Sequence, residues 1–401
     1  MLPLEEAIAM AAAWAAPLSS ATMVPPVDAA GRVLAHRILA RLSAPSFDRS
    51  AMDGYAVRAG DGLRAGTRLR VVGRIAAGAR GTALGPGEAA RIFTGAPTPP
   101  GADAVVMQED VRREGGAVVL SRAVACGANV RPLGEDVAEG AVLAEAGTRV
   151  DPRLVALLAS QGIGSVAVRR RPRVAVLSTG DELVGPGERL RAAAIHDANR
   201  PMLLALLRSA GCETVDGGIE RDDPDEQAAR LGALAREADL IVTSGGASVG
   251  EADHAARAIL RAGGTARTLA MALKPGKPAV LGRVGGACVL GLPGNPVSAL
   301  VVFLLLGRAL LSGLAGAAPQ RPLGLPLPLA APLARKAGRT EFVPARLVRD
   351  GAATRVALLS SNSARLRPLV EADGVAEIPA ETTRAAAGTP VAFHPFHGLL
   401  C

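Results

Sequence analysis

Two lysines stand out in a chain that otherwise uses arginine for positive charge. Only three of the 45 basic residues are Lys, and Lys274 and Lys277 share one five-residue segment, Lys-Pro-Gly-Lys-Pro. The ammonium of lysine is a compact point charge, whereas the guanidinium of arginine is a planar fork. The two lysines kept in this arginine-rich chain therefore indicate a site that needs ammonium donors. Chance clustering is the alternative interpretation.

A second rigid turn follows in the segment Leu-Pro-Gly-Asn-Pro, which contributes Pro293, Asn295 and Pro296. Proline fixes φ and glycine permits close backbone approach, so both turns are stiff. A stiff loop can hold donors against an oxyanion at low entropic cost. Two ordinary tight turns are the alternative.

Three polar turns come directly after expected strands, at 178–182, at 221–224 and at 244–253. Ligands of open α/β sheets bind at the carboxyl ends of strands, so these turns are predicted to converge on one crevice. The last turn begins Ser244-Gly245-Gly246 and runs into a helix, whose free N–H groups suit a phosphate or similar anion. A plain tight connection would use glycines in the same way.

Carboxylates crowd the same turns and would repel an anionic substrate unless a cation lay between them. Mg²⁺ is the natural cation, because it binds one or two carboxylates together with substrate phosphates. The carboxylates of these turns, among them Asp181, Asp222 and Asp253, would supply its ligands. Asp181, Asp222 and Asp253 could instead be helix N-caps, and both interpretations stay open.

Other polar residues carry weaker signals. Asp53 and Thr94 stand in small-residue segments, Ser-Ala-Met-Asp-Gly-Tyr-Ala and Thr-Gly-Ala-Pro, that could be plain hairpin turns. The four Asn residues all lie in turn-like segments, which turn chemistry alone would explain. His196 and His254 are isolated, so no transition-metal site is predicted and both are expected at the surface or behind other site residues. A Ser–His–Asp hydrolase is unsupported, because no Gly-x-Ser-x-Gly follows a strand.

The elements that must position these residues define a multi-domain α/β protein. Helical patterns cover 4–16 and about 150–161, short β-rich runs fill the segment between them, and strands alternate with helices from Val174 to Arg261. The alternation predicts a central, doubly wound, mostly parallel sheet. The predicted units are a helical N-terminal domain (1–40 with 130–165), an inserted β-rich domain (41–129), the α/β domain (166–318) and a C-terminal β-domain (319–401).

Composition excludes several classes of protein. A length of 401 residues exceeds the roughly 250–300 residues of a single core. The formal charge of +8 is spread along the chain, and one Tyr and one Trp offer no stacking platform, so no nucleic acid is expected. Four Cys without a C-x-x-C pair indicate a reducing cytoplasm. No membrane is expected either, since the apolar run from Val297 to Leu306 is short of the roughly 20 residues that span a bilayer and indicates a buried helix.

Taken in order, these motifs resemble the molybdopterin molybdenumtransferase family over essentially the whole chain. The matching segments begin at Ser50, Thr94, Gly134, Ser178, Ser244, Lys274 and Leu292. The resemblance implies an elongated four-domain subunit that forms a homodimer, with the site between the α/β domain of one subunit and the β-rich part of its partner. It also implies the reaction: adenylyl-molybdopterin and molybdate give molybdenum cofactor and AMP, with Mg²⁺.

Residues that match the family's functional positions are carried over one by one. The functional polar set would be Asp53, Thr94, Asp136, Glu182, Asp222 and Asp253, with Asp222 and Asp253 as the foremost Mg²⁺ contacts. Lys274 and Lys277 would hold molybdate, and Arg339 and Ser363 would complete that site from the last domain. Ser244, Gly245, Gly246, Pro293, Asn295 and Pro296 would bind substrate.

The chain departs from the family pattern at two positions, and two other functions remain as alternatives. Arg49 stands where Asn is usual and His196 where Tyr is usual. The α/β part alone also resembles molybdopterin adenylyltransferase, and relatives of this fold also serve as non-catalytic scaffolds. Expected protein partners are the adenylyltransferase and downstream cofactor-handling proteins. Molybdate and tungstate cannot be told apart from the sequence, because they share charge and shape.

Overall fold

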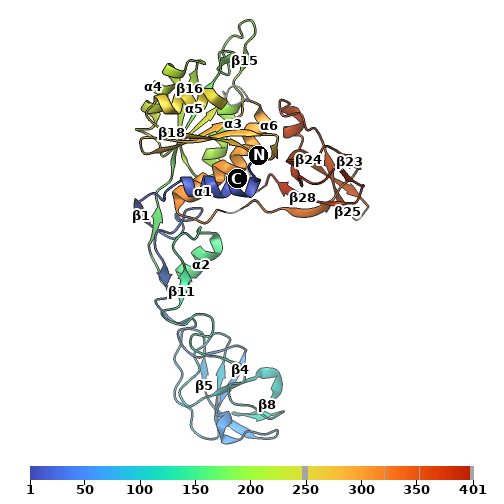
Figure 1. Cartoon of the computed structure of the whole chain (residues 1–401). Helices are drawn as coiled ribbons and strands as arrows, with labels where there is room; N and C mark the ends of the chain where they lie inside the picture. The colour runs from blue at the N-terminus through green and yellow to red at the C-terminus, as the bar shows by residue number, and fades with distance from the viewer. Residues whose placement is uncertain (246–251, 320, 352, 398–401) are drawn as a thin grey trace.

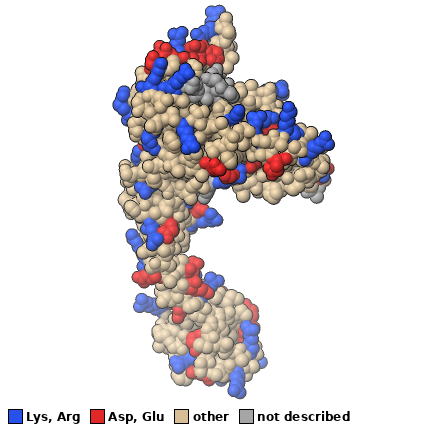
Figure 2. All heavy atoms as spheres, viewed as in Figure 1, with Lys and Arg blue, Asp and Glu red and all other residues tan. Residues whose placement is uncertain are grey.

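The computed structural model describes residues 1–245, 252–319, 321–351 and 353–397 of an elongated molecule (Figure 1). The α/β sheet and the C-terminal sheet lie beside one another at one end, and the β-rich sheet lies at the other, with an arm of short strand pairs between them (Figure 1). On the face drawn in Figure 2, Lys and Arg side chains are scattered among Asp and Glu rather than gathered in one patch.

The central sheet has six strands, and the four that come first in its order run parallel. Its order is β16 (Glu213–Glu220), β13 (Arg173–Thr179), β17 (Leu240–Ser244), β21 (Ala287–Leu292), β20 (Pro278–Val284) and β18 (Thr265–Ala270). Strand β20 runs antiparallel to both of its neighbours, β21 and β18. The α/β class predicted from the alternation is confirmed, with a mixed sheet.

Helices cover both faces of this sheet because successive side chains of a strand point to opposite faces. On β13, Val174 and Val176 enter one hydrophobic core, while Ala175 and Leu177 enter another. The first core is covered by α3 (Asn199–Ser209), α6 (Pro296–Val302) and α7 (Arg308–Ala315), and the second by α4 (Pro224–Leu234) and α5 (Ala252–Arg261).

The apolar run at Val297 belongs to a longer helical segment than the sequence suggested. A π-helical turn, Phe303–Gly307, joins α6 to α7, so that Pro296–Ala315 is 20 residues long with a mean hydropathy of 2.1. The length prediction was therefore wrong, since 20 residues can span a bilayer. The segment is nevertheless 78% buried inside the structure, as expected for the core helix of a folded domain.

The predicted helical N-terminal domain is wrong. Helix α1 (Leu4–Trp14) does not join it but packs on α7, where Leu4, Ala7 and Ala11 enter the core of the α/β unit. The Ala-rich pattern specifies a helix with an apolar face, but not the partner of that face. What remains is one helix and short paired strands: α2 (Pro152–Ser160), β1 (Ala21–Val24), β2 (Ile38–Leu39), β3 (Arg49–Ser50), β10 (Val130–Arg131), β11 (Val142–Ala144) and β12 (Val166–Arg169).

The β-rich sheet at the far end has six strands. Its order is β7 (Ala104–Met107), β4 (Gly54–Val57), β6 (Glu88–Ile92), β5 (Arg68–Ile75), β9 (Ala117–Leu120) and β8 (Val111–Glu114). Two short 3-10 turns, Ala59–Asp61 and Gln108–Asp110, accompany it. The β-rich character predicted for this stretch is confirmed, and Asp53 immediately precedes β4.

The C-terminal sheet includes one strand from the α/β part of the chain. Its order is β19 (Leu273–Lys274), β24 (Thr340–Asp350), β26 (Gly374–Ile378), β28 (Pro390–Pro395) and β22 (Leu325–Pro328), and β25 (Ala353–Leu358) pairs with β24. The pair β23 (Leu333–Ala334) and β27 (Arg384–Ala385) and the short helix α8 (Arg367–Val370) complete this part. Because β19 pairs with β24, Lys274 lies where the two units join.

Candidate functional site

A cavity of about 960 Å³ lies at the carboxyl ends of the parallel strands, where the α/β unit meets the C-terminal unit. The polar turns that were predicted to converge do so here, although the roles of their residues remain predictions. The predicted site residues that line it are Glu182, Asp222, Ser244, Gly245, Lys274, Lys277, Pro293, Asn295, Pro296, Arg339 and Ser363.

The lysine turn is tightly closed against α6. The backbone N of Met271 donates to the carbonyl oxygen of Lys277 at 2.8 Å, which fixes the ends of the turn. Gly276 has φ +106°, and a Cβ there would lie 2.4 Å from Cγ2 of Val302. Only glycine fits, so both lysines project from a backbone with little freedom.

The turn after β17, which was predicted to bind an anion, has an equally strict glycine. Gly245 has φ +111°, and a Cβ there would lie 2.1 Å from the carbonyl oxygen of Thr179. The close approach joins the ends of β17 and β13, which places Ser178, Thr179 and Ser244 on one cavity wall. Gly246 and the rest of the turn through residue 251 lie outside the described residues.

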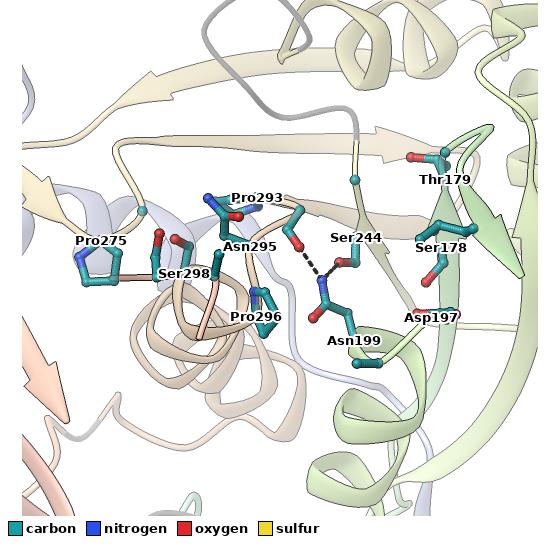
Figure 3. Close-up of a pocket in the computed structure, with 18 of the residues that line it drawn as sticks. Ser178, Thr179, Asp197, Asn199, Ser244, Pro275, Pro293, Asn295, Pro296 and Ser298 are labelled. Carbon is teal, nitrogen blue, oxygen red and sulfur yellow. Dashed lines mark hydrogen bonds between the residues drawn. The ribbon is translucent and has the colours of Figure 1, made fainter. Parts of the chain in front are cut away.

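Asn199 links two of the turns and was missed as a site residue. From the first residue of α3, its Nδ2 donates to Oγ of Ser244 at 2.8 Å and to the carbonyl oxygen of Gly294 at 2.7 Å (Figure 3). Its Oδ1 is buried and has no hydrogen-bond partner within the described part of the chain. The available signal was the scarcity of Asn, since one of four lies in a turn beside the crevice.

In the second rigid turn, the side-chain amide of Asn295 does not cap the helix that follows. Asn295 is the N-cap residue of α6, but its side chain makes no capping hydrogen bond, and it lines the cavity with Ser298 (Figure 3). The backbone N of Val297 donates instead to the carbonyl oxygen of Ser363 at 3.1 Å. This bond brings the C-terminal segment to the start of α6.

The carboxylates divide between capping and the cavity. Asp223 caps α4 by accepting from the backbone N of Asp225 at 2.7 Å and of Glu226 at 3.0 Å, and these bonds lower its pKa. The N-cap alternative therefore applies to Asp223 rather than Asp222, which lines the cavity with Glu182. Asp181 lines an adjoining cavity of about 410 Å³.

No ready-made metal cluster is present among the described residues. Within them, no three His, Cys, Asp or Glu side chains are grouped so that they could hold an ion. The side chain of Asp253, one of the two predicted metal contacts, lies outside what the structure describes.

Both histidines that were expected at the surface or behind other residues line the cavity. His196, on β15 (Ile195–His196), which pairs with β14 (Leu183–Val184), has Nδ1 3.1 Å from the carbonyl oxygen of Gly185. His254, on α5, has a buried Nδ1 without a hydrogen-bond partner in the described ranges. Asp197, also missed, lines the cavity and is 2% exposed, and it accepts from Nε of Arg200 at 2.9 Å.

Three predicted residues are not among those that line this cavity. Asp53 and Thr94 adjoin β4 and β6 of the β-rich sheet, which lies at the other end of the molecule (Figure 1), and Asp136 lies between β10 and β11. Asp53 and Thr94 are paired, since the backbone N and Oγ1 of Thr94 each lie 2.8 Å from Oδ1 of Asp53. These bonds lower the pKa of Asp53. Asp136 is exposed, and its backbone N donates to the carbonyl oxygen of Ala44 at 3.0 Å.

Comparison with protein-family models gives three matches in chain order. Residues 2–162 match the MoeA N-terminal region (domain I and II), residues 175–313 match a probable molybdopterin binding domain, and residues 326–396 match the MoeA C-terminal region (domain IV). The large cavity lies between residues of the second and third matched regions.

Individual proteins match along most of the chain. A molybdopterin molybdenumtransferase of Haemophilus influenzae is 44% identical over 72% of this chain and 72% of its own length. Molybdopterin molybdenumtransferase 2 of Mycobacterium tuberculosis is 39% identical over 91% of this chain and 93% of its own.

The fold is similarly matched by solved structures. A molybdopterin biosynthesis MoeA protein of Pyrococcus horikoshii has a TM-score of 0.82 and 29% identity over 98% of this chain and 100% of its own. The three matched regions follow one another in the order of the family, and the relatives align along most of the chain. The chain therefore belongs to the molybdopterin molybdenumtransferase family.

Proposed function

We propose that this protein inserts molybdate into adenylylated molybdopterin and releases AMP. The observation that carries the proposal is one cavity lined by two of the three lysines of the chain, by Gly245 of the turn after β17 and by three carboxylates, those of Glu182, Asp197 and Asp222. Ammonium groups suit a tetrahedral dianion, and the turn suits a phosphate. Two relatives bear the name molybdopterin molybdenumtransferase, which supports transfer of molybdenum to molybdopterin.

In this proposal each wall of the cavity has a separate task. Lys274 and Lys277 dock molybdate, and Arg339 and Ser363 complete the oxyanion site from the C-terminal unit. Backbone N–H groups near Ser244, Gly245 and Gly246 hold the pterin phosphate. Pro293, Asn295 and Pro296 form the facing wall. Fixed donors of this kind stabilise charge while the phosphoanhydride bond is cleaved.

Mg²⁺ is part of the proposal because the donor set suits it. Glu182 and Asp222 bring two carboxylates into a cavity proposed to hold a pyrophosphate, and Mg²⁺ is commonly bound by one or two carboxylates and substrate phosphates. Asp222 and Asp253 are the proposed principal contacts, with Glu182 beside them. When bound, the ion would offset the charge of the pyrophosphate.

A homodimer would bring the remaining predicted residues to the site. Asp53, Thr94 and Asp136 lie away from the cavity of their own chain, so they can serve it only from a second copy. A two-fold dimer creates two equivalent composite sites. Exposed apolar side chains along the connecting arm suit such contact, among them Met23, Val27, Leu42 and Leu133.

The proposal keeps the four-part division of the chain at 1–40 with 130–165, 41–129, 166–318 and 319–401. Helix α1 packs on the α/β unit, so the first part contributes to two cores. It also keeps the cytoplasmic location, in line with the unpaired thiols of Cys126, Cys212 and Cys288. Protein partners would be the adenylyltransferase and downstream cofactor-handling proteins.

The direct test measures AMP release from adenylyl-molybdopterin with and without molybdate and with and without Mg²⁺. Release that requires both ions is expected. Accumulation of adenylyl-molybdopterin from ATP and molybdopterin would instead identify an adenylyltransferase. If Asp53→Ala and Lys274→Ala both keep the wild-type rate of molybdate-dependent release, the catalytic assignment of these residues must be abandoned. No release from the wild-type protein would instead indicate a scaffold without catalysis.

A further inference from the structure

A buried carboxylate of the C-terminal sheet holds one of the two cavity lysines. Glu341 lies on β24 directly opposite Lys274 on β19, and its side chain is 6% exposed. Its Oε1 is 2.7 Å from Nζ of Lys274, and its Oε2 is 3.2 Å from Nε of Arg335, whose side chain is 7% exposed. Glu341 therefore stands between two cations.

The ion pair of Lys274 and Glu341 links two strands, and it also lies at the wall between two cavities. Lys274, Arg339 and Ser361 line both the large cavity and a second cavity of about 460 Å³, and Glu341 lines only the second. The ammonium is thus drawn into the wall that the two cavities share. The second cavity is also lined by Arg335 and Lys336, so its described lining residues include four cations and one carboxylate, that of Glu341.

Arg335 anchors the carboxylate from behind. Its guanidinium donates to the carbonyl oxygen of Pro379 at 2.8 Å and to those of Ile378 and Arg339. The same group therefore restrains the carboxylate that meets Lys274 and the backbone of Arg339, the other cation of the shared wall. A long lysine side chain loses much rotamer freedom on binding an anion, and a contact that orders it beforehand removes part of that cost.

We propose that Glu341 is a positioning residue, which holds the Lys274 ammonium in the wall between the two cavities ready for an incoming tetrahedral oxyanion. The inference rests on the proposed function in that molybdate is taken as the anion. Glu341 itself touches no substrate in this scheme. It acts through Lys274, and a purely structural ion pair is the competing explanation.

The chain permits a direct measurement of the contact, because it has only three lysines to follow. Acetylation of the full-length protein with limiting acetic anhydride, followed by peptide mass spectrometry, gives a rate for Lys274, Lys277 and Lys336 separately. We expect Lys274 to react more slowly than the exposed Lys336, and Glu341→Gln to accelerate Lys274 severalfold. Glu341→Gln keeps the side-chain volume and a hydrogen-bond acceptor.

Glu377→Gln is the matched control. Glu377 is a half-buried carboxylate of the same sheet, paired with Arg321 and His394 rather than with a cavity lysine. Its substitution should leave the Lys274 rate at the wild-type value. Equal Lys274 rates in wild type and Glu341→Gln, measured on monodisperse folded protein, would overturn the proposal, as would equal acceleration by both substitutions.

The kinetic arm separates positioning from structure. We expect Glu341→Gln to raise KM for molybdate more than it lowers kcat, and to have no further effect in a Lys274→Met background. Effects that multiply in the double variant would mean that Glu341 acts independently of Lys274 and would reject the proposal. If the wild-type protein releases no molybdate-dependent AMP, the proposed function fails. The positioning of Lys274 can still be tested by the protection that molybdate alone gives Lys274 against acetylation. Weaker protection in Glu341→Gln than in wild type supports the proposal, and equal protection in both opposes it.

Discussion

Thr94 donates two hydrogen bonds to a single carboxylate oxygen of Asp53, one from its backbone N and one from Oγ1, each 2.8 Å long. These bonds favour the ionised form and lower the pKa of Asp53, with a further contribution from the charge of Arg91. Arg91 also donates to the carbonyl oxygen of Gly54, next to Asp53. The predicted site residue at the far end of the molecule is thus held as an oriented anion.

Thr94→Ala should raise the pKa of Asp53 part of the way towards its ordinary value, because one of the two donors is lost. A carboxylate with a lowered pKa contributes stabilisation above its unfolded-state pKa and loses it as the pH falls through the folded-state pKa. Because the proposed reaction uses the ionised form of Asp53, the acid limb of the molybdate-dependent rate should also move to higher pH in Thr94→Ala. It should stay in place in Thr94→Ser, which keeps the hydroxyl donor. Carboxyl carbon NMR of Asp53 gives the midpoint directly, and an unchanged midpoint in Thr94→Ala would contradict the assignment.

Complementation tests whether Asp53 and Lys274 act together across two subunits. Asp53→Asn and Lys274→Met homodimers should each keep only a small residual activity, whereas a refolded equal mixture should recover about a quarter of the wild-type activity. Half of the dimers then hold one of each chain, and one of their two sites carries neither substitution. Activity that stays at the level of the separate variants after verified subunit exchange would place both residues in the same site of one chain.

Much of the site was predictable from sequence because its residues sit at strand ends and in rigid turns. Ser244, Asp222 and Glu182 follow parallel strands, whose carboxyl ends share one edge of the sheet. Lys274 and Lys277 were found from their rarity alone. Chain topology then brings such residues together without any knowledge of side-chain contacts.

The parts that sequence could not predict depend on long-range packing. The Ala-rich pattern of α1 gives no indication that its apolar face meets α7, about three hundred residues later. Glu341 looks like any strand carboxylate until β24 pairs with β19. Asn199 looks like a turn residue until the packing of α3 on β13 and β16 brings it to Ser244. His254 belongs to no metal-binding spacing in the sequence, and its place at the cavity depends on the fold.

Asn199→Ala should lower the free energy of unfolding by about 1–3 kcal/mol, because the amide is 8% exposed and its loss leaves the buried hydroxyl of Ser244 and the carbonyl oxygen of Gly294 without their donor. Urea denaturation measures the change. Asn362→Ala is the control, since Asn362 is exposed and its side chain accepts a local bond from the backbone N of Ala364. Its effect should stay within about 0.5 kcal/mol. Similar losses in the two variants would show that the Asn199 bridge contributes nothing special.

Gly245→Ala should both destabilise the protein and abolish molybdate-dependent turnover. The new Cβ would lie 2.1 Å from the carbonyl oxygen of Thr179, at a φ of +111° that other residues rarely adopt, so β17 and β13 must move apart where they form the cavity wall. A loss of about 1–3 kcal/mol is expected from the backbone strain.

Gly232→Ala is the matched control, because Gly232 lies inside α4 and a Cβ there meets nothing within 4 Å. That change should stabilise the helix by about 0.5–1 kcal/mol and leave turnover intact. Thermal unfolding and AMP release measured on both variants decide the matter: full turnover in Gly245→Ala would mean that the close approach of the two strand ends is not needed for the reaction.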